Sequence, residues 1–165
     1  GIIGTDGTIK SRVYLNAIKA IDPDVSVFSK SCPLFVPLAE EGWIDNDVAF
    51  LTANKYLSEL KDQDIDTLVL GCTHYPILKD VISRVVGNNV MLIDSGQETA
   101  LEILKVLQDK NLLNANLQTQ PSHKFFVTDS PERFIQVGEL FLGTNFNNNV
   151  DKVDVMQYTL LNLAS

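Results

Sequence analysis

One stretch, residues 67–76 (TLVLGCTHYP), constrains the fold of this chain more than any other. Residues 67–70 are β-branched or apolar throughout, which is typical of a strand buried on both faces of a parallel sheet. Gly71 permits a tight exit from that strand, and Pro76 favours the first turn of a helix. Cys72 and His74 are therefore expected at the carboxyl end of a parallel strand, where open α/β sheets place their ligands.

Strand and helix patterns alternate along the rest of the chain. Strands are expected at residues 1–4, 25–29, 67–70, 90–93, 124–128 and 153–156. Helices are expected over residues 9–21 and 45–60, and after Pro76, Ser95 and Ser130. Residues 111–122 are polar and without period, which indicates a surface connection. Strict alternation implies parallel strands joined by right-handed crossovers, so the sequence predicts an α/β parallel-sheet layer fold.

Composition limits the classes of function. The chain has 165 residues, of which 45% are hydrophobic and 21% charged, as in an ordinary globular domain. A net charge of −8 argues against nucleic-acid and anionic membrane partners. No apolar run is long enough to span a membrane, and no signal peptide is evident. Two cysteines are too few for a disulfide framework, so a reducing, cytoplasmic location is expected.

The Cys72–His74 pair has two readings on chemistry alone. A thiol at a strand exit is drawn toward thiolate by a helix end and a nearby imidazole, which makes it reactive. Alternatively, Cys72 is a small buried apolar residue and His74 an ordinary turn residue. The spacing also resembles half of a metal site. Because only Cys32 and His123 remain as soft ligands, no metal is expected.

The motif GCTHYP, preceded by DTLVL, resembles the second cysteine motif of glutamate racemases, in the aspartate/glutamate racemase superfamily. Three more stretches resemble the same family in the same order. They are GIIGTDGTIKS at the start, CPLFVPLAEEG, and VMLIDSGQETA after the cysteine motif. The resemblance is dense from residue 1 to about residue 99 and looser over residues 101–165.

This resemblance implies two α/β lobes with the active site between them, the second lobe being inserted into the first. Residues 1–93 would form the inserted lobe, and residues 94–165 would form the returning, incomplete half of the first lobe. Glutamate racemases carry a further portion before the stretch that begins here, with the first cysteine motif. We therefore expect a fragment that exposes apolar faces and self-associates, so that a homo-oligomer is expected.

The resemblance also implies an activity: interconversion of L- and D-glutamate without a cofactor. Two thiols on opposite faces of the substrate would move the α-proton, and the product D-glutamate would supply peptidoglycan and cell-wall formation in the cytoplasm. Cys72 would be the thiol that faces the L-enantiomer. Its partner is expected outside this chain, so the fragment alone should be inactive. Cys32 falls in the CPLFVPLAEEG stretch rather than in the first cysteine motif of the family, so it is expected to be structural.

Further roles follow by position in the family motifs. His74 would tune the Cys72 thiol or relay its proton, and Glu40 would supply a carboxylate near His74. Thr73 would bind the substrate carboxylate or amino group. Thr5 and Thr8, in another strand-to-helix turn, would also touch substrate. The lettering Asp94-Ser95-Gly96 copies an acidic loop of the family, but Ser95 and Glu98 form a capping box, so no catalytic role is assigned there.

Two other classes of function remain open from the residues. A Cys-His hydrolase would use Cys72 as its nucleophile and form a covalent acyl intermediate. A non-catalytic binding module would use the same fold for assembly or regulation.

Overall fold

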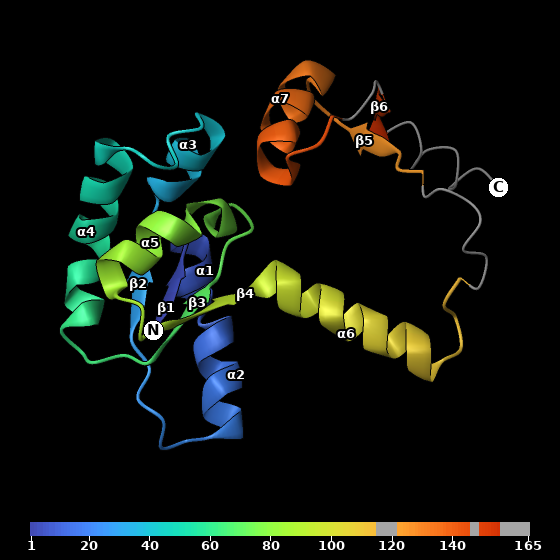
Figure 1. The fold of residues 1–165 in the computed structure, drawn as a ribbon. Helices are drawn as coiled ribbons and strands as arrows, with labels where there is room; N and C mark the ends of the chain where they lie inside the picture. Colours follow the sequence, from blue (N-terminus) through green and yellow to red (C-terminus); the bar gives the residue numbers. More distant parts are fainter. Residues whose placement is uncertain (115–121, 146–148, 156–165) are drawn as a thin grey trace. The chain divides into compact units, whose positions relative to one another are not determined.

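The computed structural model describes residues 1–114, 122–145 and 149–155 (Figure 1). The chain divides into two compact units, Gly1–Leu113 and Asn114–Ser165. No helix in these described ranges is both long and apolar enough to cross a membrane. The boundary expected after residue 93 concerns lobes of a larger protein and stays a prediction. Within this chain, the helix that follows residue 94 groups with the first unit.

The first unit is built on a four-stranded parallel sheet, with strand order β2-β1-β3-β4. The strands are β1 (Ile2–Gly4), β2 (Ser29–Ser31), β3 (Thr67–Leu70) and β4 (Met91–Asp94). All three pairings are parallel, which confirms the predicted α/β class. Because the strands run the same way, the segments that follow β1, β2, β3 and β4 all leave from one edge of the sheet.

The hydrophobic core lies between this sheet and the helices α4 (Asp47–Lys61) and α5 (Lys79–Val86). Helix α4 buries Ala49, Ala53, Leu57 and Leu60, and α5 buries Val81, Ile82, Val85 and Val86. In β3 only Leu68 and Leu70 are buried, whereas Thr67 and Val69 are half-buried. The second face of β3 is therefore covered in part only, contrary to the expectation of complete burial on both faces.

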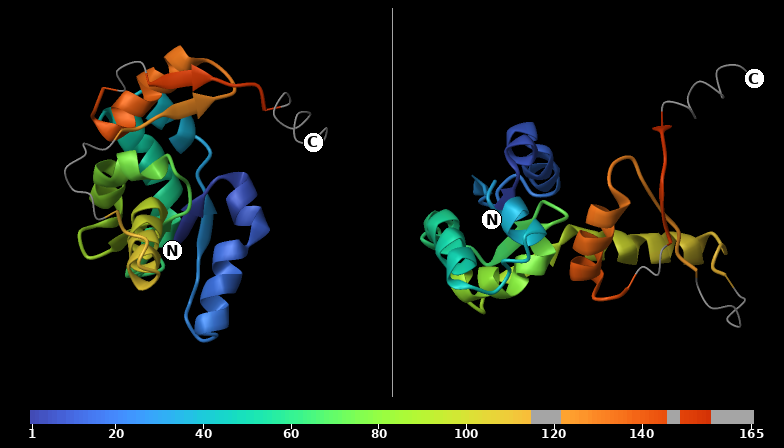
Figure 2. Two further views of the ribbon diagram at one scale, coloured as in Figure 1. Left: turned by 90° about the vertical axis from the view of Figure 1, so that its right-hand side faces the viewer. Right: turned by 90° about the horizontal axis from the view of Figure 1, so that it is seen from above.

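Residues 9–21 do not form the single helix that their apolar spacing predicts. They divide into α1 (Asp6–Ser11) and α2 (Val13–Ile21), because Arg12 adopts a left-handed conformation with φ of 55°. Neither helix buries a residue, and Val13 and Ile21 are 64% and 88% exposed. Figure 2 shows α2 and α4 on opposite sides of the sheet.

Two further elements differ from the sequence expectation. Strand β2 lies at Ser29–Ser31 rather than over residues 25–29. Helix α3 (Phe35–Glu40) was not predicted, since prolines flank and interrupt its sequence. The backbone N–H groups in the first turn of a helix have no partner within the helix, so a proline there costs no hydrogen bond. Pro37 is the third residue of α3 and is therefore tolerated. Burial of Phe35, Leu38 and Ala39 then holds α3 in place.

Helix α6 (Ser95–Asp109) begins one residue earlier than a Ser95 cap requires. Asp94 is the N-cap, and its Oδ1 accepts hydrogen bonds from the backbone N–H groups of Gly96 at 2.9 Å and Gln97 at 3.2 Å. The predicted capping box of Ser95 and Glu98 is therefore wrong: a carboxylate held at the end of β4 reaches those N–H groups first.

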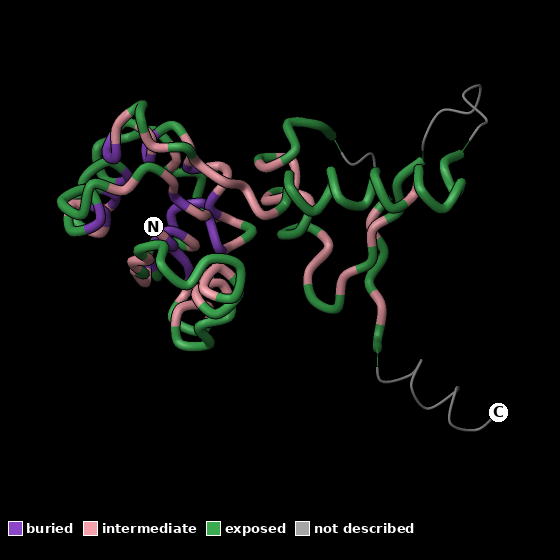
Figure 3. The backbone as a smooth tube through the Cα atoms, turned by 90° about the horizontal axis from the view of Figure 1, so that it is seen from below, coloured by how far each residue is buried: buried purple, intermediate pink, exposed green. Residues whose placement is uncertain are grey.

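Helix α6 buries none of its residues. Its exposed apolar side chains are Leu101, Ile103, Leu104 and Val106. Figure 3 shows that the buried residues lie in the part of the chain around the four-stranded sheet, whereas α6 is exposed or half-buried. This agrees with the expectation that the segment after residue 94 exposes apolar surface.

The second unit contains a two-stranded parallel sheet of β5 (Phe125–Val127) and β6 (Val150–Lys152), with helix α7 (Pro131–Leu142) between them in sequence. Helix α7 begins after Ser130, as predicted, and Ser130 caps it by accepting a hydrogen bond from the N–H of Arg133. The final strand lies three residues before its expected position at 153–156, and Met156 is outside the described residues. Residues 115–121 of the expected surface connection are also outside them.

Candidate active site

The turn that leaves β3 carries the predicted thiol and imidazole. Gly71 has no room for a side chain, because a Cβ atom there would lie 2.8 Å from the backbone oxygen of Ile3 and 3.1 Å from Cε2 of Tyr14. The backbone N–H of Gly71 donates to that same Ile3 oxygen at 2.8 Å. The chain therefore leaves β3 pressed against β1, and Cys72 follows directly at the carboxyl edge of the sheet.

His74 lies between a thiol and a carboxylate. Its Nδ1 is 3.9 Å from Sγ of Cys72, and its Nε2 is 3.3 Å from Oε1 of Glu40. The His74 and Glu40 side chains are 30% and 32% exposed, so both remain accessible to a small solute. The Glu40, His74 and Cys72 side chains, which we call the Glu40–His74–Cys72 line, come together from α3 and from the β3 exit.

This arrangement is suited to moving a proton. The imidazole has one nitrogen toward the sulfur and the other toward the carboxylate, which orients the ring between the two groups. A thiol paired with an imidazole can act as a base or as an acid, depending on which group holds the proton. Placing Glu40 beside His74 is what the family motif implied, and the structure brings the two together.

The three threonines lie at the same edge of the sheet. Thr73 is exposed and lies between Cys72 and His74 in the turn. Thr8 lies against the β3 exit, since a Cβ on Gly71 would be 3.4 Å from its Cγ2. Thr5 caps α1: the N–H of Thr8 donates to its Oγ1 at 3.4 Å, and the two hydroxyl oxygens are 3.1 Å apart. Substrate binding by these hydroxyls stays a prediction.

Cys32 is not part of this constellation. Its side chain is fully buried, and burial raises the pKa of the thiol to about 12, while the nearby Lys30 acts in the opposite direction. A thiol of this kind is neutral and unreactive near neutral pH. The expectation that Cys32 is structural agrees with its burial. Among the residues that the structure describes, no group of His, Cys, Asp and Glu side chains could hold a metal ion.

Comparison with known proteins identifies the family. The family model described as Asp/Glu/Hydantoin racemase matches residues 1–103, which include all of the residues placed at this edge of the sheet. The chain belongs to this racemase family. The matched range includes Cys72, His74 and Glu40, so the thiol, the imidazole and the carboxylate all lie within the family domain.

Curated relatives of this racemase-family chain are glutamate racemases. Glutamate racemase from Geobacter metallireducens is 54% identical over 143 residues, which cover 87% of this chain and 53% of that protein. Glutamate racemase from Thermoanaerobacter pseudethanolicus is 42% identical over 158 residues, or 96% of this chain and 59% of that protein. The chain thus spans between half and two thirds of the length of the curated relatives it matches.

Solved structures show the same racemase fold. Glutamate racemase from Francisella tularensis in complex with D-glutamate superposes with a TM-score of 0.86 at 37% identity, over 96% of this chain and 58% of that one. A glutamate racemase isoform from Bacillus anthracis also gives a TM-score of 0.86, at 39% identity, over 94% of this chain and 57% of that one.

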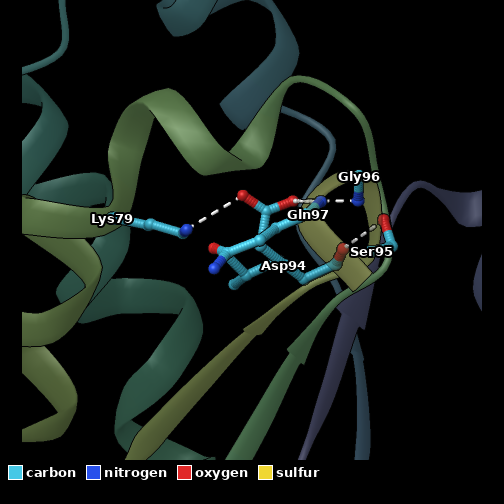
Figure 4. A network of polar contacts seen from close by, with 6 residues as sticks. Lys79, Asp94, Ser95, Gly96 and Gln97 are labelled. Carbon is cyan, nitrogen blue, oxygen red and sulfur yellow. Dashed lines mark hydrogen bonds and ion pairs between the residues drawn. The ribbon is translucent and has the colours of Figure 1, made fainter. Parts of the chain in front are cut away.

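Two structural features of the site escaped the sequence reasoning. Lys79, at the start of α5, forms an ion pair of 2.8 Å with Asp94, and Ser95 Oγ donates to the carbonyl of Leu70 at 3.3 Å (Figure 4). Burial acts to raise the pKa of Asp94, but the Lys79 ammonium and the N–H groups of Gln97 and Gly96 outweigh it and lower the pKa. The lettering gave no signal for these contacts, because they join residues from different elements.

Proposed function

We propose that this chain carries one half of the acid/base machinery of a glutamate racemase, with Cys72 as the thiol on one face of the substrate. The observation that carries the proposal is the position of His74 between Cys72 and Glu40, at 3.9 Å and 3.3 Å, within the matched family domain. Glutamate as substrate is supported by the names of the relatives and by the structure of one of them with D-glutamate.

In the proposed reaction, the Cys72 thiolate removes the α-proton of L-glutamate. The Cα–H bond breaks, the proton passes to Sγ, and the electron pair stays on the substrate as a carbanion. An acid on the opposite face then returns a proton and gives D-glutamate. In the reverse direction Cys72 is the acid. We infer that the opposing thiol belongs to residues outside this chain and that no cofactor takes part.

His74 and Glu40 act on the sulfur in this proposal. His74 takes or returns the proton of Cys72 through Nδ1, and Glu40 fixes the ring through Nε2 and stabilises the imidazolium. Thr73, Thr5 and Thr8 supply hydroxyl and backbone N–H groups for the substrate carboxylate and ammonium. All of these groups belong to the carboxyl edge of one sheet, where a small amino acid would bind.

The cellular role follows from the product. D-glutamate would be made in the cytoplasm. It would be used in peptidoglycan synthesis, and so in cell-wall formation and the maintenance of cell shape. The partners of the protein would be the amino acid itself and further copies of the chain, with no nucleic acid and no membrane. The exposed apolar side chains of α6 support self-association, and the net charge of −8 disfavours polyanions.

The test is racemisation by the whole enzyme that contains this sequence, with Cys72→Ser as the variant and Cys32→Ser as the matched thiol control. We expect Cys72→Ser to abolish conversion in both directions and Cys32→Ser to retain it in the fraction that folds. The 165-residue chain alone should convert no L-glutamate to D-glutamate. Undiminished racemisation by Cys72→Ser would contradict the proposal. An acyl-enzyme trapped on Cys72 would instead favour the Cys-His hydrolase.

A further inference from the structure

The geometry of the Glu40–His74–Cys72 line depends on how helix α3 packs against the turn that follows β3. Cys72 and His74 belong to the turn after β3, whereas Glu40 is the last residue of α3. The distance of 3.3 Å between His74 Nε2 and Glu40 Oε1 is therefore set by how α3 packs on the turn. The His74 and Glu40 side chains are 30% and 32% exposed, so this contact alone is a weak restraint on the geometry.

Tyr75 is the residue that joins the two elements. It directly follows His74 and begins the 3-10 helix η1 (Tyr75–Leu78). Its hydroxyl donates to the backbone carbonyl of Cys32 at 2.9 Å, a bond that is fully buried. The same carbonyl accepts the N–H of Phe35, the first residue of α3, at 3.1 Å. One acceptor thus binds both the turn and the start of α3.

The ring of Tyr75 reinforces this bond. It packs edge-to-face on Phe35, with centroids 5.2 Å apart and planes at 86°. On the other side, the backbone N–H of Tyr75 donates to the carbonyl of Cys72 at 3.1 Å, which closes the turn that holds the thiol. Tyr75 is fully buried, so these contacts are shielded from water. Burial also raises the pKa of its phenol, which keeps the hydroxyl a donor.

We propose that Tyr75 is a positioning residue for this site: its buried hydroxyl on the Cys32 carbonyl sets α3 against the turn and so holds Glu40 on the His74 imidazole. Tyr75 does not touch substrate in this role. The inference concerns the same site as the proposed function but rests only on geometry within the chain. It can therefore be tested without a racemisation assay.

The experiment uses the 165-residue chain and the variant Tyr75→Phe, which keeps the ring and removes the hydroxyl. The matched control is Tyr56→Phe. Tyr56 also packs edge-to-face on Phe35, at 5.5 Å and 87°, and its hydroxyl accepts the N–H of Leu34 at 3.3 Å, but it has no bond to the turn. The control thus removes a hydroxyl bond at the start of α3, where Leu34 is the N-cap, but leaves the bond between α3 and the turn after β3 in place.

The first readout is the imidazole ¹⁵N spectrum, which reports how each ring nitrogen is hydrogen-bonded. The chain has two histidines, and His123 serves as an internal reference. We expect Tyr75→Phe to move the His74 signals toward those of Glu40→Gln, and Tyr56→Phe to leave them at the wild-type position. His123 should be unchanged in every variant. His74 signals that coincide in Tyr75→Phe and wild type would overturn the proposal.

The second readout is the rate of Cys72 alkylation by iodoacetamide at fixed pH, followed by mass spectrometry. Loss of one buried neutral hydrogen bond should lower this rate by about threefold to tenfold in Tyr75→Phe, and by less in Tyr56→Phe. If Tyr75 acts through His74, Tyr75→Phe should add nothing further in a His74→Ala background. An equal fold-change in both backgrounds would show that Tyr75 does not work through the imidazole.

A folding defect leaves the proposal testable. If iodoacetamide modifies Cys32 as fast as Cys72 in the Tyr75→Phe variant, that variant is unfolded, and Phe35→Leu is used in its place. That change removes the ring contact and keeps the hydroxyl bond, so the His74 signals should move in the same direction by a smaller amount; unmoved signals would overturn the proposal. Because none of these readouts involves glutamate, failure of the racemisation test leaves them unaffected.

Discussion

His74 Nε2 lies 3.3 Å from Oε1 of Glu40, although the two residues come from a strand exit and from a separate short helix. This contact gives the imidazole a fixed acceptor on the side away from Cys72. A thiol and an imidazole that are close in sequence are common in turns. A carboxylate brought in by another element, within the same racemase-family domain, is what makes the pair suited to proton transfer.

Glu40→Gln is expected to lower both the Cys72 alkylation rate and racemisation by the whole enzyme. A neutral amide supports the imidazolium poorly, and loss of one group from acid/base machinery costs on the order of 10² in rate or more. The matched control is Glu41→Gln, since Glu41 is the exposed neighbour at the end of α3. Equal rates in the two variants would remove Glu40 from the proposed mechanism.

Cys32 should resist alkylation in the folded chain under conditions in which Cys72 reacts completely. Cys32 is fully buried and its pKa is raised to about 12, whereas Cys72 is half-buried. Peptide mass mapping after short exposure to iodoacetamide measures both thiols in one sample. Modification of Cys32 before Cys72, without unfolding, would contradict the structure.

The same burial predicts how stability depends on alkaline pH. The pKa of the Cys32 thiol is raised from 9.0 in an exposed reference to about 12 in the fold. As pH rises, Cys32 therefore loses its proton in the unfolded chain before it does so in the folded chain. The contribution of Cys32 is fully present below pH 9 and is lost as pH rises toward 12. Tyr75 acts in the same direction, because burial raises its pKa as well. Urea unfolding between these limits should show a shallower pH slope in Cys32→Ala than in wild type.

Asp94→Ala is expected to destabilise the start of α6 by about 1 kcal/mol through loss of the N-cap, and further through loss of the Lys79 ion pair. The pKa of Asp94 is lowered in the fold, so its contribution is present at neutral pH and is lost as pH falls through that lowered value. Hydrogen exchange at the Gly96 and Gln97 amides measures the effect. Glu98→Gln is the control, since Glu98 takes no part in the cap; a larger effect there would reinstate the capping box.

Self-association of the chain is expected through the exposed apolar side chains of α6. Leu104→Lys should lower the apparent mass in light scattering at a given concentration and reduce binding of a hydrophobic dye, since Leu104 is 45% exposed. Ile21→Lys, at an 88% exposed position on α2, is the control. A monodisperse wild-type monomer that binds no dye would contradict this prediction.

The sequence was sufficient for the features that depend on local pattern. The apolar run at residues 67–70, closed by Gly71, predicted β3 and the position of Cys72 at its exit. Alternation of strand and helix predicted a parallel sheet, because chains with that order have few other ways to bury both layers. The family motifs indicated that Glu40 belongs near His74.

Tertiary structure decided the rest. The cap on Asp94 is accompanied by a contact from another element, the ion pair with Lys79, which the local sequence does not specify. The break at Arg12 follows from its left-handed backbone conformation, for which the local apolar spacing gave no signal. Helix α3 forms because Phe35, Leu38 and Ala39 are buried by residues distant in sequence, not because its own propensity requires it. The distance from Glu40 to His74 and the bond from Tyr75 to Cys32 exist only once α3 has packed on the β3 exit, since no local pattern specifies a contact between separate elements.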